Sequence, residues 1–213
     1  MNVFDSWGVA SSGLFTFANS PKHVGLYHKF GYYPRFLNAI LEKEIVPSGS
    51  ATEYATFSSL GPKEKQSSLE ECQKLTSALY PGLDLSSEIL LVDDYKLGDT
   101  LLLRDGRTIS GFAIFQNGPK TEAGKEKCEL KFGAVKGGSG MEERFGTLLE
   151  AAQSFTIQRG VQKLDTGINL AHSGAFDLML RKGFQITFMG VDMQKPSESA
   201  FDRGGTYVLS DLR

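Results

Sequence analysis

Apolar side chains recur at helical spacing in two segments of this chain. In residues 69–79 they stand three, three and four positions apart, at Leu69, Cys72, Leu75 and Leu79. A wider apolar stripe follows further along, and Gly160 ends it, with the side chains Phe145, Leu148, Leu149, Ala152 and Phe155. Such spacing places apolar side chains on one face of a helix, so both segments are predicted to be amphipathic helices.

Shorter apolar runs predict the strands, and the strongest signal among them is a hairpin. Residues 101–104 and 109–115 are apolar runs joined around Asp105 and Gly106, a pair typical of tight hairpin turns. Further strands are predicted at residues 54–60, 128–136, 163–169 and 206–212. Three segments without a recognisable pattern are expected to be loops: 61–65, 81–97 and 118–127.

A weak internal repeat relates the beginning of the chain to its end. A shift of 152 positions places Leu26 on Leu178 and Gly31 on Gly183. Each glycine follows a predicted helix and precedes a predicted strand. The predicted elements are a strand at 14–18, a helix from 21 and a strand at 32–41 in the first copy, and a helix at 173–182 and a strand at 184–193 in the second.

The break at residues 47–50, with the sequence Pro-Ser-Gly-Ser, is typical of a linker. We therefore expect two parts, residues 1–46 and residues 47–213. The total of 213 residues exceeds one domain of roughly 150 residues by about 60, too few for an ordinary second domain. The first copy of the repeat accounts for that surplus.

Composition and charge exclude several classes of protein. The chain is 40% hydrophobic and 23% charged, as in ordinary globular proteins, and no apolar run is long enough to cross a membrane. With 23 basic and 25 acidic residues, it offers no general attraction to nucleic acid or anionic lipid. Cys72 and Cys128 lie far apart without metal-ligand spacing, so we expect no disulfide, no metal site and a cytoplasmic protein.

Three segments carry a resemblance to the GNAT acyltransferases. They are the helix residues 148–152 ahead of Arg159, Gly160 and Val161, the strand 164–169, and the segment 178–184, with the sequence Leu-Met-Leu-Arg-Lys-Gly-Phe. The segment 20–32 is similar to the same C-terminal signature. The chain resembles the latter part of a tandem GNAT protein, with residues 1–46 as the remnant of a first unit and 47–213 as a complete second unit. The resemblance implies an α/β (α+β) fold with a mixed central sheet flanked by helices.

The resemblance also implies an activity, the transfer of an acetyl group from acetyl-CoA to the amine of a small molecule or peptide. In the family, backbone amides at the end of one strand hold the thioester and the pantetheine, and the next helix binds the pyrophosphate at its N-terminus. The segment 128–136 corresponds to that strand here. A helix N-terminus suits an anion because its first amides lack partners. The positions implied to bind the cofactor are Ala134, Val135, Lys136, Gly137, Gly138, Ser139, Gly140 and Asn169.

The turn before that helix departs from the family pattern. Gly140, Glu143 and Phe145 stand where the family has Arg or Gln, then Gly, then Gly or Ala. Ser139 and Glu142 fit a capping box, and its carboxylate would occupy amides that phosphates need. Two alternatives therefore stay open at this turn: a glycine-rich amide nest that binds CoA, or a self-capped structural helix.

Amine acetylation needs a base for the amine and an acid for the departing thiolate. Candidate bases are Glu129, Asp165 and His172. Strand alternation puts Glu129 on one face with Lys131, Gly133 and Val135, so the alternative is a plain surface carboxylate that pairs with Lys131 or with solvent. The family's acid, a tyrosine, is present as Tyr27 in the first copy but replaced by Met179 in the second. The candidate catalytic residues are Glu129, Tyr27 and His172.

The run 36–41 is apolar on both faces, so as a strand it must be sandwiched and paired. It can join the sheet of the same chain, pair with its copy in a homodimer, or dock on another chain. We expect a homodimer through residues 14–41. Two functions remain: an acetyltransferase, or a non-catalytic GNAT-like module with a degenerate CoA site that serves in dimerisation or ligand binding.

Overall fold

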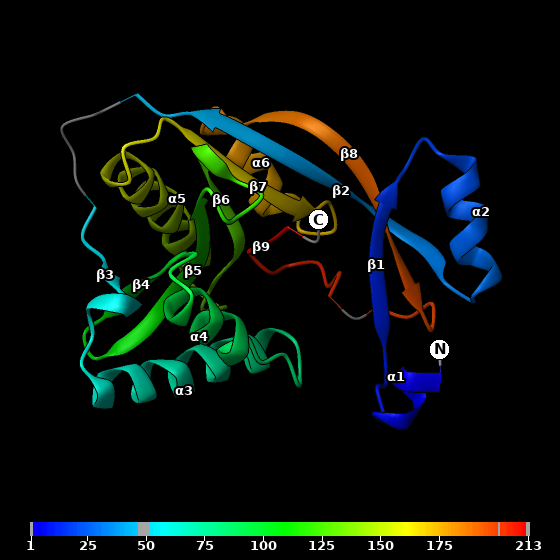
Figure 1. The fold of residues 1–213 in the computed structure, drawn as a ribbon, viewed down its shortest axis with the longest axis horizontal. Coiled ribbons are helices and arrows are strands. Elements are labelled where there is room, and N and C mark those ends of the chain that lie inside the picture. Colours follow the sequence, from blue (N-terminus) through cyan, green and yellow to red (C-terminus); the bar gives the residue numbers. More distant parts are fainter. Residues whose placement is uncertain (1, 47–51, 200, 212–213) are drawn as a thin grey trace.

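A nine-stranded mixed sheet connects both ends of the described chain (Figure 1). The computed structural model describes residues 2–46, 52–199 and 201–211. The strand order is β1-β8-β2-β7-β6-β5-β4-β3, and β9 pairs with β6 off this path. The strands are β1 (Ser12–Phe17), β2 (Tyr33–Glu44), β3 (Ala55–Thr56), β4 (Gly98–Asp105), β5 (Thr108–Gly118), β6 (Gly124–Val135), β7 (Lys163–Asn169), β8 (Gln185–Lys195) and β9 (Val208–Ser210).

Helices cover both faces of this sheet. One core lies under α5 and α6 and includes Phe145 and Leu148, and a second core lies under α3 and α4 and includes Phe57 and Phe112. A small third cluster lies under α2, where Val24 packs against it. The helices are α1 (Asn2–Ser6), α2 (Pro21–Lys29), α3 (Pro62–Leu79), α4 (Ser86–Asp94), α5 (Met141–Gln158) and α6 (Ser173–Arg181). Within the described residues, no helix is both long and apolar enough to cross a membrane.

The internal repeat is visible in the strand pairing. Asn38 in β2 lies opposite Gly190 in β8, which is the residue that the 152-position shift assigns to it. The outer pairs follow the same relation, because Phe15 opposite Asp192 in β1 and β8 corresponds to Gly167 opposite Ile40 in β7 and β2. The two copies are thus arranged in the sheet as an antiparallel, approximately two-fold pair.

Strand β2 joins the sheet of its own chain, between β7 and β8 (Figure 1). This is the first of the three arrangements open to it. Residues 38–41 are buried as expected, but Phe36 and Leu37 are 42% and 43% exposed, so the sandwiched part of the strand is shorter than predicted. The pairing with β8 is irregular between Pro34 and Leu37, and there the apolar run reaches the surface.

The structure corrects several of the predicted segments. The expected loop 61–65 contains the start of α3, which begins at Pro62, and the strand expected at 206–212 is described only over Val208–Ser210. Residues 81–97 contain α4, whose Ile89 and Val92 pack into the core under α3 and α4. The expected loop 118–127 holds the end of β5 and the start of β6, where a polar hairpin extends beyond the apolar core. The strand expected at 54–60 is only Ala55–Thr56, followed by a 3-10 turn at Phe57–Ser59. The predicted linker at 47–50 lies outside the described residues.

Candidate functional site

The parallel strands β6 and β7 form a fork. They pair only where Cys128 to Leu130 lie beside Leu164 to Thr166. Directly after this stretch, the pairing of β6 with β5 shifts by one residue, so that Lys131 is the extra residue of a β-bulge. A bulge bends its strand and re-aims the following side chains. The two strands diverge beyond this point, which is where the resemblance places the thioester.

Strand β9, the last of the described strands, lies in this fork. Phe132 to Ala134 of β6 pair with Val208 to Ser210, and the amide of Asp211 donates to the carbonyl of Lys131 over 2.8 Å. On the other side the approach to β7 is close, because a Cβ on Gly167 would lie 2.5 Å from the carbonyl oxygen of Ser210. The edge of β6 expected to hold pantetheine is therefore paired with the chain's own β9.

The N-terminus of α5 is not capped as the sequence predicted. The helix begins after Gly140, whose φ of 75° lies in the left-handed region, and no side chain caps it. The predicted capping box of Ser139 and Glu142 is wrong, because Glu142 instead accepts hydrogen bonds from Arg181 over 2.9 Å and from Tyr207 over 3.3 Å. Arg181 lies on α6 and Tyr207 just before β9. The carboxylate of Glu142 therefore makes tertiary hydrogen bonds instead of capping its own helix.

The glycine-rich turn before α5 is open to solvent. Residues 136–140 are exposed, whereas Ala134 and Val135 are buried. The guanidinium of Arg144 donates to the carbonyls of Lys136 over 2.8 Å and of Gly137 over 3.2 Å, which folds the turn back over the first turn of α5. An exposed turn with two basic side chains beside an uncapped helix N-terminus suits a phosphate group.

A buried carboxylate, Asp192, lies on the opposite side of β7 from β6. The side-chain amide of Asn169 donates to its Oδ2 over 2.6 Å, and that of Asn38 to both oxygens over 3.3 Å. Asn169 also accepts a hydrogen bond from the amide of Ala171 over 2.9 Å. Burial raises the pKa of Asp192, and the two amide donors oppose that shift. Asn169, which was predicted to bind the cofactor, thus uses its side chain in hydrogen bonds to this carboxylate and to the turn after β7.

A cavity of about 180 Å³ lies in front of Asp192. Strand β8 alternates here, because Val191 and Met193 face α2 whereas Asp192 and Gln194 line the cavity. The other walls come from β1, β6, β9 and the segments around α3 and α4, with Gly13, Leu14, Tyr80, Leu83, Leu85, Phe132, Phe201, Val208 and Ser210. A second cavity, of about 370 Å³, adjoins it across Leu85, Phe132 and Ser210.

Glu129, the first candidate base, is 1% exposed and forms an ion pair with Lys131 at 3.4 Å. The neighbouring Asp165 forms one with Lys127. The expected pairing of Glu129 with Lys131 is confirmed, but its expected position at the surface is wrong, because the carboxylate is buried. The predicted shared face is also wrong beyond the bulge, because Val135 packs under α5 together with Cys128 and not on the side of Glu129.

His172 and Tyr27 lie in two other clusters. His172 is 1% exposed, with Tyr80 Oη 3.1 Å from Nε2 and Thr206 Oγ1 3.0 Å from Nδ1, and burial lowers its pKa. Tyr27 is half-buried on α2, against a cluster that includes Met193. Met179, which replaces the family's tyrosine in the second copy, is fully buried under α5 and α6. The structure does not bring the three predicted catalytic residues together.

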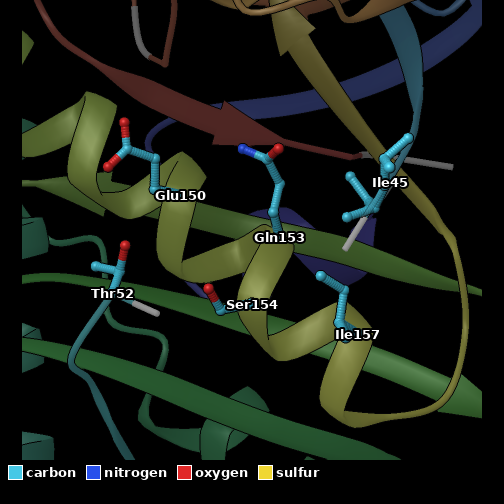
Figure 2. Close-up of a pocket in the computed structure, with 7 residues that line it drawn as sticks. Ile45, Thr52, Glu150, Gln153, Ser154 and Ile157 are labelled. Carbon is cyan, nitrogen blue, oxygen red and sulfur yellow. The ribbon is translucent and has the colours of Figure 1, made fainter. Parts of the chain in front are cut away.

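A further cavity, of about 320 Å³, runs along α5, as Figure 2 shows. Glu150, Gln153, Ser154 and Ile157 of α5 line it, and Ile45 and Thr52 lie on either side of them. The backbone between Ile45 and Thr52 includes residues 47–51, which lie outside the described part of the chain. We assign no function to this cavity.

Sequence reasoning missed Asp192, Gln194 and the place of β9 in the sheet. The strand segment Val191-Asp192-Met193-Gln194 alternates apolar and polar residues, and that pattern was a usable signal for two polar side chains on one face. The short β9 was predicted as a strand, but its neighbour in the sheet depends on the fork between β6 and β7, which the sequence does not display.

Comparison with protein-family models and with curated proteins finds no match. Solved structures do match. A GCN5-related N-acetyltransferase from Sphaerobacter thermophilus is 16% identical with a TM-score of 0.59, covering 87% of this chain and 59% of its own. A putative acetyltransferase from Pyrococcus horikoshii is 14% identical with a TM-score of 0.58, covering 95% of this chain and 59% of its own. The glucosamine N-acetyltransferase region of a fungal multi-domain β-N-acetylglucosaminidase has a TM-score of 0.59 at 14% identity, covering 90% of this chain and 26% of that protein.

These matches show the fold alone, which is that of the GNAT acetyltransferases, with a mixed sheet flanked by helices. The expected fold class is confirmed. The chain spans 59% of the length of each of the first two structures. A shared fold does not by itself fix the activity, the substrates or the partners of a protein.

Proposed function

We propose that this chain is an N-acetyltransferase that moves an acetyl group from acetyl-CoA to a primary amine. The observation that supports this most directly is the fork of β6 and β7 next to the exposed, uncapped N-terminus of α5. On a GNAT fold, these two features provide backbone donors for a thioester and for phosphates. The turn at 136–140 would hold the phosphates, with Lys136 and Arg144 beside it.

When bound, acetyl-CoA supplies the thioester whose carbonyl carbon the amine attacks; the C–N bond forms and the C–S bond breaks. The nitrogen loses a proton and the departing thiolate gains one, so a proton acceptor must lie near the fork. We assign this role to Glu129, which lies two residues before the bulge on β6. We assign no role in the chemistry to Tyr27 or His172, because they lie in separate clusters.

Strand β9 restricts where acetyl-CoA can bind. It pairs with the same edge of β6 that the pantetheine needs, so both cannot occupy the fork at once. Acetyl-CoA would bind only the fraction of molecules from which β9 has moved out, and its apparent affinity is reduced by that fraction. Weakening the attachment of β9 should therefore strengthen cofactor binding.

The second candidate is a non-catalytic GNAT-like module with a degenerate CoA site. Two observations favour it: β9 occupies the fork, and Met179 stands at the position of the family's tyrosine. In this case β9 is a permanent part of the sheet, and the chain serves in dimerisation or ligand binding. For either candidate we expect a cytoplasmic protein. The expected homodimer through residues 14–41 stays a prediction, and among the described strands of that segment only β1 has an edge left for it, because β2 is already paired with β7 and β8 of its own chain.

The two candidates differ in calorimetric titration with acetyl-CoA. We compare the wild type with Leu209→Ser, which removes a fully buried side chain of β9, and with Leu69→Ser on α3 as a control for general destabilisation. The enzyme predicts saturable binding that is several-fold tighter in Leu209→Ser than in the wild type or the control. Absence of heat and of thermal stabilisation at millimolar acetyl-CoA, in folded Leu209→Ser as well as in the wild type, would overturn the enzyme and favour the module.

A further inference from the structure

We infer that the cavity in front of Asp192 binds a primary amine that carries a compact apolar group. The inference deepens the proposed function, since it names the class of acceptor, and it rests on that function only in calling the ligand an acceptor. Binding itself follows from the polar atoms and the walls of the cavity.

Gln194 brings to the cavity an acceptor without a donor. Gln194 is 5% exposed, and its side-chain oxygen is buried without a hydrogen-bond partner. The side-chain oxygen of Asn38, the residue that holds Asp192, is in the same state. A buried acceptor without a donor costs about 1–3 kcal/mol, so a ligand that brings donors is favoured here.

Asp192 adds negative charge to these acceptors. It is 5% exposed, and within the described residues no lysine, arginine or histidine forms an ion pair with it. Asn38 and Asn169 hold the carboxylate in one orientation from two different strands. Because a buried carboxylate is strongly stabilised by a cation, the ligand that complements this site is positively charged, and an ammonium group also supplies three donors.

The remaining walls define the rest of the ligand. Leu14, Leu85, Phe132, Phe201 and Val208 make most of the surface apolar. A sugar or nucleotide would leave its polar groups unpaired against these side chains, and an acid would be repelled by Asp192. The volume of about 180 Å³ is below the roughly 300–1,000 Å³ of pockets for drug-sized ligands. The cavity therefore fits a compact apolar amine, such as an arylalkylamine.

The cavity also borders the fork. Val208 and Ser210 of β9 line it, together with Phe132, the first residue of β6 after the bulge. An amine bound to Asp192 thus lies against β9, on the strand that would have to move for acetyl-CoA to enter. The cavity therefore places an amine next to the fork, and part of its wall is the same strand that acetyl-CoA must displace.

The test is direct binding without acetyl-CoA, by calorimetry and thermal shift. The probes are 2-phenylethylamine, its neutral analogue 2-phenylethanol and the polar amine ethanolamine. The inference predicts saturable binding of 2-phenylethylamine that is at least ten-fold tighter than binding of either other probe. Equal binding of the alcohol and the amine, or no binding of the amine to the folded protein, would overturn it.

Three variants locate the site. Asp192→Asn removes the charge and should weaken binding of 2-phenylethylamine ten-fold or more, while Gln194→Met should weaken it by a smaller factor. The exposed carboxylate variant Asp94→Asn is the matched control and should bind as the wild type does. If Asp192→Asn does not fold, Gln194→Met alone decides, and unchanged binding overturns the site. Amine binding without acetyl-CoA binding would leave this inference standing and remove the proposed function, and the reverse result would do the opposite.

Discussion

Asn38 and Asn169 lie directly opposite each other across β2 and β7, and both donate their side-chain amides to one buried carboxylate. They lie far apart in the sequence, since Asn38 belongs to the first copy of the repeat and Asn169 ends β7, just before the helix of the second copy. The carboxylate, Asp192, lies on the third strand of the same group, β8. The junction between the two copies is therefore held by a polar contact as well as by the apolar core.

The two asparagines should be energetically coupled. Asn169→Ala removes the 2.6 Å bond and the turn contact to Ala171, and should lower the free energy of unfolding by about 2–3 kcal/mol. Asn38→Ala should lower it by about 1–2 kcal/mol. The double variant should lose less than the sum, because both remove donors from the same carboxylate. Urea denaturation at pH 7 measures this, and strictly additive losses would contradict the shared role.

The close approach of β9 to β7 predicts a specific effect of adding one methyl group. Gly167→Ala places a Cβ 2.5 Å from the Ser210 carbonyl oxygen and 2.9 Å from Asp211 Cα, so β9 must shift. We expect a loss of roughly 1–3 kcal/mol in stability and faster amide exchange at Leu209 and Asp211. Hydrogen exchange with mass spectrometry measures the second effect.

Gly25→Ala is the control for that substitution. Gly25 lies within α2, and a Cβ there meets no atom within 4 Å. Because alanine is a better helix former than glycine, this variant should gain about 0.5–1 kcal/mol and leave exchange in β9 unchanged. Unaltered exchange in the Gly167→Ala variant would show that β9 does not depend on this contact.

His172 should make the stability of the protein depend on pH. Burial lowers its pKa in the folded state below 6.5, so the folded protein keeps the imidazole neutral while the unfolded chain takes up a proton. Stability should therefore fall as the pH drops through the unfolded value near 6.5. Denaturation midpoints at pH 7.5 and pH 5.5 test this, and His172→Gln should show a smaller decrease than the wild type. An equal decrease in both proteins would contradict the assignment.

Most individual helices and strands were predictable from the sequence, but the pairing between strands was not. The strand at Lys163–Asn169 and the hairpin around Asp105 have strong local signals, apolar runs and a turn pair, and the structure confirms both. The repeat also predicted two copies of a helix, a glycine and a strand. It did not predict their antiparallel pairing through Asn38 and Gly190, because pairing partners depend on contacts across the whole chain.

The candidate site was less predictable, for physical reasons that concern few residues. The extra residue Lys131 in the bulge reverses the face of every later residue of β6, and no composition signal marks it. Glu142 has the spacing of a capping box but bonds to Arg181, because a tertiary ion pair competes with the local cap. The role of Asp192 depends on its hydrogen bonds from Asn38 and Asn169, which lie on two other strands.

The first turn of α5 provides the last prediction, which concerns charge at the proposed phosphate site. Glu142 and Glu143 both lie in this turn, and Glu142 is paired with Arg181. The helix dipole stabilises the carboxylate of Glu143, but this carboxylate repels a phosphate that binds at the same helix N-terminus. Glu143→Gln should therefore raise the affinity for acetyl-CoA about two- to five-fold, the effect of roughly 0.3–1 kcal/mol expected for one charge at a helix terminus.

The matched control is Glu88→Gln, which removes the first-turn carboxylate of another helix, α4. Both variants should lose a few tenths of a kcal/mol in stability, but only Glu143→Gln should change acetyl-CoA binding. The gain should shrink at 0.5 M salt, because screening weakens an exposed charge interaction. An equal change in both variants would show that the effect is global, and no change in Glu143→Gln would place the phosphates elsewhere than the N-terminus of α5.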